Sequence, residues 1–84
     1  MKPIRFTQHA LEKLSLVHEW GFTIDEEAII EALQQPQEVL SGHLKRSIVH
    51  IILDELHILR VIYEEDGEIT VITMYPGRRR RYEG

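Results

Sequence analysis

The order of apolar and polar positions divides the chain into a helical first half and a strand-rich second half. Residues 3–6 alternate between apolar and polar side chains, which is typical of a short strand. Thr7 offers a hydroxyl suited to a helix N-cap, and apolar residues then recur at helical spacing. These apolar positions are Ala10, Leu11, Leu14 and Val17. The pattern predicts a short N-terminal strand followed directly by a first helix.

A second helix is predicted after a glycine break. Gly21 suits the left-handed position that ends a helix, and we expect Trp20 and Phe22 to pack into the gap between the two helices. Thr23 and Glu26 have the spacing of a capping box, which predicts that the second helix starts at Thr23. Its apolar stripe consists of Ala28, Ile29, Ala32 and Leu33.

Strands are predicted beyond Pro36, which ends the second helix because it restrains its predecessor and lacks an N–H. We expect a short strand over residues 37–40 and a turn at Ser41-Gly42. Three segments rich in Ile, Val, Leu and Tyr follow as a meander, at residues 47–53, 56–63 and 68–75. Asp54-Glu55 and Asp66-Gly67 separate them as tight turns.

Two-residue turns would place Arg60 directly opposite Thr73 and would sort the strand residues onto two faces. We expect the helices to cover the face that collects Val49, Ile51, Leu53, Leu56, Ile58, Ile62, Ile69 and Val71, together with Arg60, Thr73 and Tyr75. The other face collects Ile48, His50, Ile52, His57, Leu59, Val61, Ile72 and Met74. Because this second face is also apolar, we expect it to form a dimer interface or the floor of a concave groove.

Length and composition predict a single small domain over residues 1–84, with residues 76–84 as a basic C-terminal tail. The chain has no cysteine to form a disulfide, and a core of this size is marginal, so we expect a homodimer. No apolar run approaches the length of a signal-peptide core or a membrane span. The expected setting is therefore cytoplasmic, with no membrane contact.

Charge is distributed unevenly along the chain. Residues 1–77 contain six basic and thirteen acidic residues, a net charge of −7, whereas residues 78–84 contain four arginines and one glutamate, a net charge of +3. Such asymmetry indicates either an anionic partner met at the C-terminus or arginines that fold onto the acidic surface of the protein itself.

Several short motifs resemble those of a known family. The segments FTQHAL at residues 6–11, GFTxxE at residues 21–26 and VITMYP at residues 71–76 occur in this order, with Pro36 between them. The chain resembles the domain-of-unknown-function family 4258 over most of residues 4–76. That family is grouped with RelE-like and BrnT-like toxins. The resemblance implies an α+β, RelE-like fold, with a short N-terminal strand and two helices packed on an antiparallel meander of three to four strands.

The same resemblance implies a function and its residues. It implies a toxin-type endoribonuclease of a toxin-antitoxin system, which cleaves single-stranded RNA without a metal ion and is controlled by an antitoxin protein. His9 matches the histidine of the opening motif, and Arg60 would be the basic residue on a central strand. The residues beyond the last strand that match are Arg78, Arg79, Arg80, Arg81 and Tyr82.

RNA cleavage without a metal needs a base, an acid, and a cation for the charge that develops on phosphorus. His9 is a candidate base or acid, and the alternative is that it packs or helps to cap the first helix. Arg60 lies among aliphatic residues and needs either a phosphate or a structural ion pair, for example with a glutamate of one of the helices. Tyr75 shares its predicted face and is the third candidate catalytic residue.

The arginine run has two interpretations. Arg78 to Arg81 are either a solvated tail or, with Tyr82, a site that holds phosphates and stacks on a base. His50 and His57 are expected near each other on one face, but two ligands do not make a metal site, so neither a metal nor a cofactor is expected. Nucleophile-elbow, phosphate-loop and dinucleotide motifs are absent from the sequence.

The sequence thus favours a metal-independent ribonuclease with RNA and an antitoxin protein as partners. The alternative is a non-catalytic dimeric adaptor that has the same fold and binds a protein through its apolar sheet face.

Overall fold

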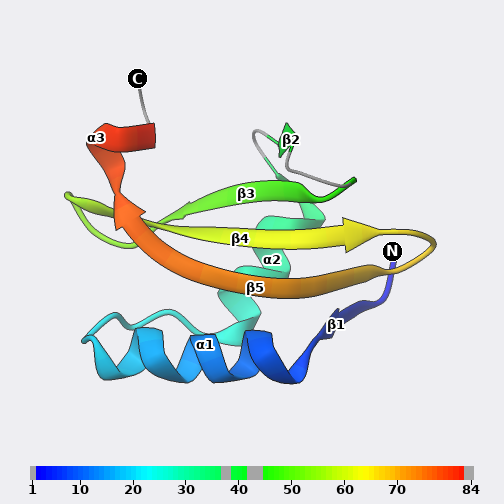
Figure 1. Cartoon of the computed structure of the whole chain (residues 1–84), viewed down its shortest axis with the longest axis horizontal. Coiled ribbons are helices and arrows are strands. Elements are labelled where there is room, and N and C mark those ends of the chain that lie inside the picture. Colours follow the sequence, from blue (N-terminus) through cyan, green and yellow to red (C-terminus); the bar gives the residue numbers. More distant parts are fainter. Residues whose placement is uncertain (1, 37–38, 42–44, 83–84) are drawn as a thin grey trace.

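The computed structural model of the chain describes residues 2–36, 39–41 and 45–82. The elements in order are β1 (Ile4–Phe6), α1 (Gln8–Glu19), α2 (Glu26–Gln34), β2 (Leu40–Ser41), β3 (Ser47–Ile52), β4 (His57–Glu65), β5 (Ile69–Arg78) and the one-turn helix α3 (Arg79–Tyr82). The strands form one sheet in the order β1-β5-β4-β3-β2 (Figure 1). The first strand runs parallel to β5, and the other neighbours are antiparallel. The predicted α+β fold is confirmed.

The start of α1 agrees with the prediction, whereas the packing of Trp20 does not. The Thr7 hydroxyl accepts a hydrogen bond from the Ala10 N–H at 3.0 Å, as an N-cap does. Gly21 ends the segment with φ of +95°. The expectation that Trp20 fills the gap between the helices is wrong, because its side chain is 56% exposed. Ile24 is the buried residue after the break, with Phe22 partly buried beside it.

The second helix starts later than its capping box predicted. Asp25 is the N-cap, since its carboxylate accepts from the Ala28 N–H at 2.9 Å, and Glu26 is already the first helical residue. Thr23 is therefore not the cap, and Glu26 cannot serve as the third helical residue of a box. The helix ends at Gln34, just before Pro36, as predicted.

The first hairpin has a three-residue turn instead of the predicted two-residue turn. Ile52 pairs with Ile58, and the Leu53 N–H donates to the His57 carbonyl at 3.0 Å, so residues 54–56 form the turn. The reason is Asp54, whose carboxylate accepts hydrogen bonds from the backbone N–H groups of Leu56 and His57 at 2.8 Å and so holds the chain in a wider turn. One residue of shift moves every side chain of β4 to the opposite face.

The second hairpin also differs from the predicted two-residue turn, because Glu65 pairs with Ile69 and residues 66–68 form a three-residue loop; a bulge then shifts the register once more. Its loop contains Gly67 with φ of +71°, and the Asp66 N–H donates to the Glu68 carbonyl at 2.9 Å. Farther along, Tyr63 pairs with Val71 while Ile62 pairs with Thr73, so Ile72 is an extra residue. The Ile72 carbonyl accepts from the Thr7 hydroxyl at 3.0 Å. The Thr7 side chain, which caps α1, therefore also provides a hydrogen-bond donor for the carbonyl of Ile72, the residue that the bulge leaves out of the ladder.

These shifts decide which side chains face the helices. Residues that form the core with α1 and α2 are Val49, Leu59, Val61, Tyr63, Ile69, Val71 and Met74. The opposite side of the sheet, called here the open face, carries Ile48, His50, Ile52, Ile58, Arg60, Ile62, Thr73 and Tyr75. The predicted faces are correct for β3 but wrong for β4, where Leu59 and Val61 lie under the helices and Ile58, Arg60 and Ile62 do not. They are also wrong for the second half of β5, where Met74 lies in the core while Thr73 and Tyr75 lie on the open face. Arg60 is therefore opposite Tyr75 and not opposite Thr73, as had been predicted. Leu56 is 63% exposed in the loop.

The C-terminal segment continues the fold where a tail was predicted. Strand β5 extends to Arg78, and Arg79–Tyr82 form α3. Of the predicted strand over residues 37–40, Leu40 belongs to β2 and Val39 does not, while residues 37–38 lie outside the described residues. Ser41, predicted to begin a turn, is the second residue of β2, and Gly42 lies outside the described residues. In the described part of the chain, no helix is long and apolar enough to cross a membrane.

The Asp54 loop predicts a pH dependence of stability. Hydrogen bonds from the backbone N–H of Leu56 and from His57 lower the pKa of Asp54 below its ordinary value of 3.8. A lowered folded pKa means that the carboxylate stabilises the fold above pH 3.8, and that this contribution disappears as the pH falls through the folded pKa. We expect Asp54→Ala to lower the urea midpoint at about pH 7 and much less at about pH 3. Glu55→Ala is the control, and an equal loss in both variants would contradict the role of Asp54.

Candidate functional site

Three polar side chains lie in a row across the open face. His50 on β3 is paired with Arg60 on β4, and Arg60 is paired with Tyr75 on β5. The Arg60 Nε donates to the Tyr75 hydroxyl at 3.1 Å, and one terminal nitrogen of its guanidinium lies 3.3 Å from the His50 Nε2. A guanidinium has only donors, so Nε2 is the acceptor and carries its lone pair toward Arg60.

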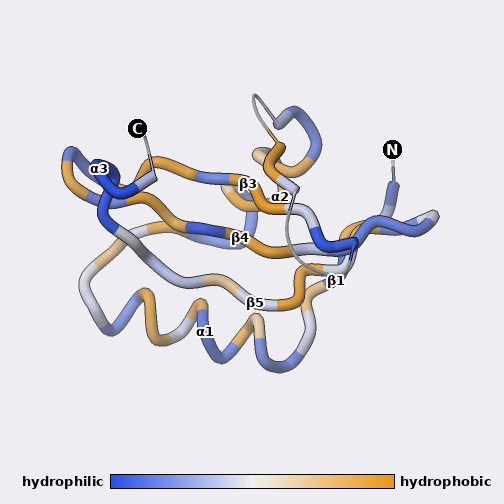
Figure 2. The backbone as a smooth tube through the Cα atoms, turned by 45° about the horizontal axis from the view of Figure 1, so that its top comes forward, coloured by the Kyte–Doolittle hydropathy of each residue, from blue (hydrophilic) through white to orange (hydrophobic). Residues whose placement is uncertain are grey.

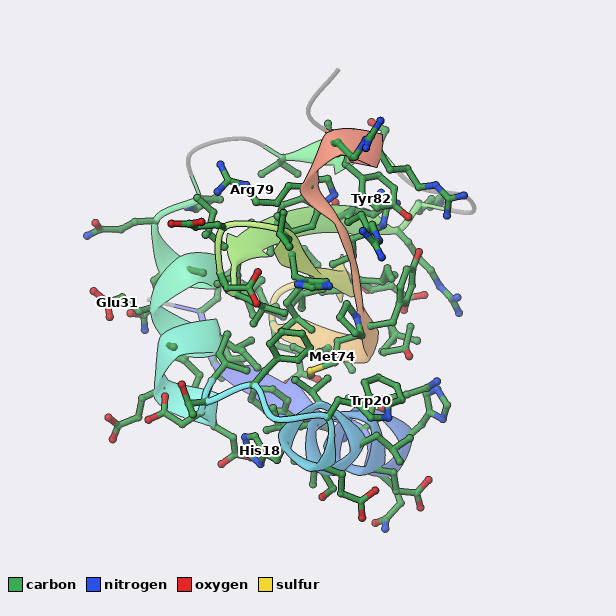
Figure 3. All side chains as sticks on the ribbon, turned by 90° about the vertical axis from the view of Figure 1, so that its left-hand side faces the viewer. His18, Trp20, Glu31, Met74, Arg79 and Tyr82 are labelled. Carbon is green, nitrogen blue, oxygen red and sulfur yellow. The ribbon has the colours of Figure 1, made fainter. Side chains whose placement is uncertain are left out.

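Tyr82 covers this row from above. Its ring centroid lies 4.2 Å from the Arg60 guanidinium carbon and 5.5 Å from the His50 ring. Figure 3 shows Tyr82 hanging from α3, on the far side of the sheet from His18 and Trp20 of the α1 segment. Gly77 makes room for the ring, because a Cβ there would lie 2.6 Å from a Tyr82 ring carbon. We call His50, Arg60, Tyr75 and Tyr82 the open-face cluster.

Arg60 is held by aromatic rings and histidine instead of by a carboxylate. Among the described residues, no carboxylate lies within ion-pair distance of Arg60, so of the two alternatives considered for this residue the structural ion pair with a helix glutamate is not found there. The Tyr75 ring centroid lies 5.7 Å from the guanidinium carbon, on a second side. Stacking of this kind leaves the charge of a guanidinium uncompensated and able to bind an anion.

The arginine run lies beside the cluster. Arg78, Arg80 and Arg81 line a hollow of about 420 Å³. Arg79 is used structurally, since its N–H donates to the Leu56 carbonyl at 2.9 Å and its guanidinium donates to the Glu55 carbonyl at 3.5 Å. In Figure 2 the hydrophilic α3 lies next to the hydrophobic strand β3. The cationic surface is therefore fixed next to Tyr82 by the fold.

His9 is not part of the open-face cluster. It is an exposed residue in the first turn of α1, next to the buried Ala10 that packs against the helix-covered face. The sheet therefore separates His9 from Arg60. The structure brings together Arg60, Tyr75 and Tyr82 from the predicted site residues and adds His50, which the sequence analysis placed on the face expected to form a dimer interface or groove floor. The feature that could have identified His50 is its pairing with Arg60 on the neighbouring strand, but the predicted register did not pair these two residues.

His50 and His57 lie on opposite faces, which corrects the prediction that they share one. The His57 ring packs edge-on against Phe22 at a centroid distance of 5.2 Å, and its Nδ1 lies 2.9 Å from the Asp54 carboxylate. The three-residue turn of the first hairpin again explains the error. Within residues 2–36, 39–41 and 45–82, no three His, Asp or Glu side chains are grouped so as to hold a metal ion.

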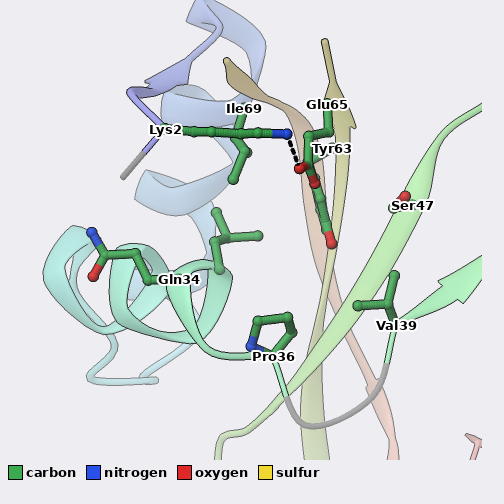
Figure 4. Close-up of a pocket in the computed structure, with 9 residues that line it drawn as sticks. Lys2, Gln34, Pro36, Val39, Ser47, Tyr63, Glu65 and Ile69 are labelled. Carbon is green, nitrogen blue, oxygen red and sulfur yellow. Dashed lines mark hydrogen bonds and ion pairs between the residues drawn. The ribbon is translucent and has the colours of Figure 1, made fainter. Parts of the chain in front are cut away.

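Two further hollows flank the sheet near the end of α2. One, of about 330 Å³, is lined by Gln34, Pro36 and Tyr63, and the ion pair between Lys2 and Glu65 lies at its rim (Figure 4). Burial raises the pKa of Tyr63 there. The other, of about 770 Å³, lies between α2, β3 and α3 and includes His50 and Tyr82 in its wall. Only the second hollow adjoins the open-face cluster.

Comparisons with known proteins support the fold. A scan of family models and a search of curated proteins found no match, so the resemblance to family 4258 stays a prediction. The solution structure of the conserved hypothetical protein HP0894 from Helicobacter pylori is similar, with a TM-score of 0.53 and 15% sequence identity. The match covers 95% of this chain and 97% of that chain. At this identity the likeness shows the fold alone: this chain has the α+β architecture of HP0894.

Proposed function

We propose that the protein is a metal-independent endoribonuclease of the RelE-like toxin type, acting on single-stranded RNA at the open-face cluster. The observation that carries the proposal is the row His50, Arg60 and Tyr75, in which the cation has no carboxylate partner among the described residues. An uncompensated guanidinium binds a phosphodiester through paired N–H donors. The hollow lined by Arg78, Arg80 and Arg81 supplies further positive charge for neighbouring phosphates.

The geometry supports a specific division of roles. With a phosphate bound to the N–H groups of Arg60, the Nε2 of His50, which faces Arg60, accepts the proton of the 2′-hydroxyl. The 2′-oxygen attacks phosphorus, and the bond from phosphorus to the 5′-oxygen breaks. The Tyr75 hydroxyl, which accepts from Nε of Arg60, keeps its own proton for the leaving oxygen. The products are a 2′,3′-cyclic phosphate and a 5′-hydroxyl, and solvent returns the proton from His50 to Tyr75.

Arg60 supplies positive charge to the reacting phosphate, and Tyr82 supplies a ring on which a base can stack. The phosphorane formed in this step carries additional negative charge, which Arg60 stabilises at short range. Tyr82 presents an aromatic ring above Arg60, and such rings stack on unpaired bases of single-stranded nucleic acid. The proposal therefore uses every member of the open-face cluster.

Incubation with a long unstructured RNA at low salt in EDTA tests the activity. We expect fragments that end in cyclic phosphates, a loss of cleavage by about two orders of magnitude in His50→Ala, and unchanged cleavage in His9→Ala. His9 is the matched control, because it is an exposed histidine on the other side of the sheet. Loss of cleavage in His9→Ala with full activity in His50→Ala would restore the sequence-based assignment and contradict ours. Circular dichroism verifies that both variants are folded.

A substitution at Gly77 is expected to weaken RNA binding at the same site. In Gly77→Ala the new methyl group would meet the Tyr82 ring, which must leave its place over Arg60. We expect single-stranded RNA to bind more weakly by ~1–3 kcal/mol, the typical contribution of one base-stacking ring, and Tyr82→Ala to show the same loss. Fluorescence anisotropy with a labelled oligonucleotide measures both. Wild-type affinity in Gly77→Ala would show that the ring position does not matter.

A non-catalytic adaptor is the second candidate function. Leu16 and Trp20 are 37% and 56% exposed on the α1 segment, away from the open-face cluster, and such side chains suit a protein partner. A homodimer and a complex with an antitoxin protein remain predictions of this kind. Intact RNA in the test above, together with a salt-insensitive dimer by light scattering, would favour the adaptor.

A further inference from the structure

The hollow of about 770 Å³ beside the open-face cluster has a composition different from that of the arginine surface. It lies between the end of α2, the outer edge of β3, and α3, and we call it the edge groove. Its volume is within the range of small-ligand sites. His50 and Tyr82 belong both to the cluster and to the wall of the edge groove. The edge groove therefore adjoins the surface at which Arg60 would hold a phosphate.

The walls of the edge groove suit an uncharged, flat group. Pro36, Leu40 and Ile52 supply apolar surface, and Ile52 is 64% exposed. No Asp, Glu, Lys or Arg side chain lines the groove among the described residues, although the arginine run lies just beyond Tyr82. A single-stranded nucleic acid has the same division between charged and uncharged parts, because its phosphates are charged and its bases are flat and neutral.

Two groups in the edge groove are suited to reading the edge of a base. The Gln35 side chain offers an amide with both a donor and an acceptor. The Leu53 N–H donates to the His57 carbonyl at 3.0 Å, so odd-numbered residues of β3 direct their backbone toward β4. Ile52 therefore directs its N–H and C=O outward, toward the groove. A glutamine amide pairs with both N6 and N7 of adenine, a pattern that other bases do not present.

We propose that the edge groove binds the base next to the phosphate held by Arg60, and that Gln35 selects adenine there. The inference rests on the proposed function for the position of the phosphate, and adds a base preference to it. Tyr82 then separates a base-binding groove from a phosphate-binding surface. Gln35 is a specificity-determining residue in this arrangement and takes no part in the chemical step.

Binding of uncleavable RNA tests the inference independently of cleavage. Labelled 2′-O-methyl hexamers of adenine and of uracil are titrated by fluorescence anisotropy into the whole protein. We expect the adenine hexamer to bind on the order of tenfold more tightly, and Gln35→Ala to remove this difference. Gln34→Ala is a matched control, because Gln34 is the preceding residue and lines the other hollow. It is expected to keep the wild-type preference.

The outcomes separate the two proposals. Equal affinity for both hexamers, or an unchanged preference in Gln35→Ala, overturns the base assignment and leaves the ribonuclease proposal standing. An adenine preference that depends on Gln35, without cleavage of the corresponding RNA, supports the groove and contradicts the ribonuclease activity. If neither hexamer binds while an extended apolar peptide perturbs the Ile52 amide resonance, the groove is a protein interface and the inference is wrong.

Discussion

Replacing Arg60 with alanine is expected to slow RNA cleavage by about a hundredfold to a thousandfold, the usual cost of removing one group that stabilises transition-state charge. Arg60 is central because it contacts His50, Tyr75 and Tyr82 at once. Its loss therefore removes the cation and also the group that positions the histidine and the tyrosine. The rate is measured under single-turnover conditions, so that weaker binding is separated from slower chemistry.

Two control variants sharpen this result. Arg60→Lys keeps the positive charge but lacks the planar fork that reaches both neighbours, so we expect it to remain strongly impaired. Arg46→Ala removes an exposed arginine whose Nε lies 3.3 Å from Glu64, on β4, and we expect it to leave the rate unchanged. Full activity in Arg60→Lys would mean that only charge matters at this position. Full activity in Arg60→Ala would remove the site from the mechanism.

The second large effect concerns stability and tests the register of the first hairpin. Leu59 is completely buried under the helices, whereas Leu56, three residues earlier, is 63% exposed. We expect Leu59→Ala to lower the free energy of unfolding by ~2–5 kcal/mol, because it leaves a cavity in the core. The same substitution at Leu56 is expected to change it by less than about 0.5 kcal/mol.

Urea denaturation of both leucine variants measures the difference directly. In a domain of this size a loss of ~2–5 kcal/mol is a large part of the total stability, so Leu59→Ala should be partly unfolded without denaturant. The sequence-based register assigns the two leucines the other way round. A larger loss in Leu56→Ala than in Leu59→Ala would therefore support the two-residue turn and contradict the structure.

The helices could be predicted from the sequence because their signals are short-range. The Thr7 cap, the Gly21 break and the Pro36 stop each act within a few residues, and each lies where the structure has it. The capping box at Thr23 was wrong for the same reason, since Asp25 offers a competing cap two residues later. Short-range sequence signals are compatible with several helix starts, and the start that is used depends on how the helix packs on the sheet.

The candidate site was only partly predictable. Arg60, Tyr75 and Tyr82 were identified from residue type and from the resemblance, but their common partner His50 was not. Three deviations from the predicted meander decide this grouping, namely the wider turn at Asp54, the three-residue loop over residues 66–68 and the extra residue Ile72 in β5. Without the bulge, strict alternation would put Tyr75 on the same face as Val71, which is buried under the helices.

The sequence by itself determined the order of the elements, the α+β class and the residue types to which the proposed function assigns RNA binding and cleavage. Periodicity, caps and turn residues act over a few positions, so they can be read without knowledge of the rest of the chain. The tertiary structure alone decided which strand residues share a face and which of them Tyr82 covers. Those outcomes depend on hydrogen bonds between residues far apart in the chain, such as Thr7 to Ile72, and on the space above Gly77.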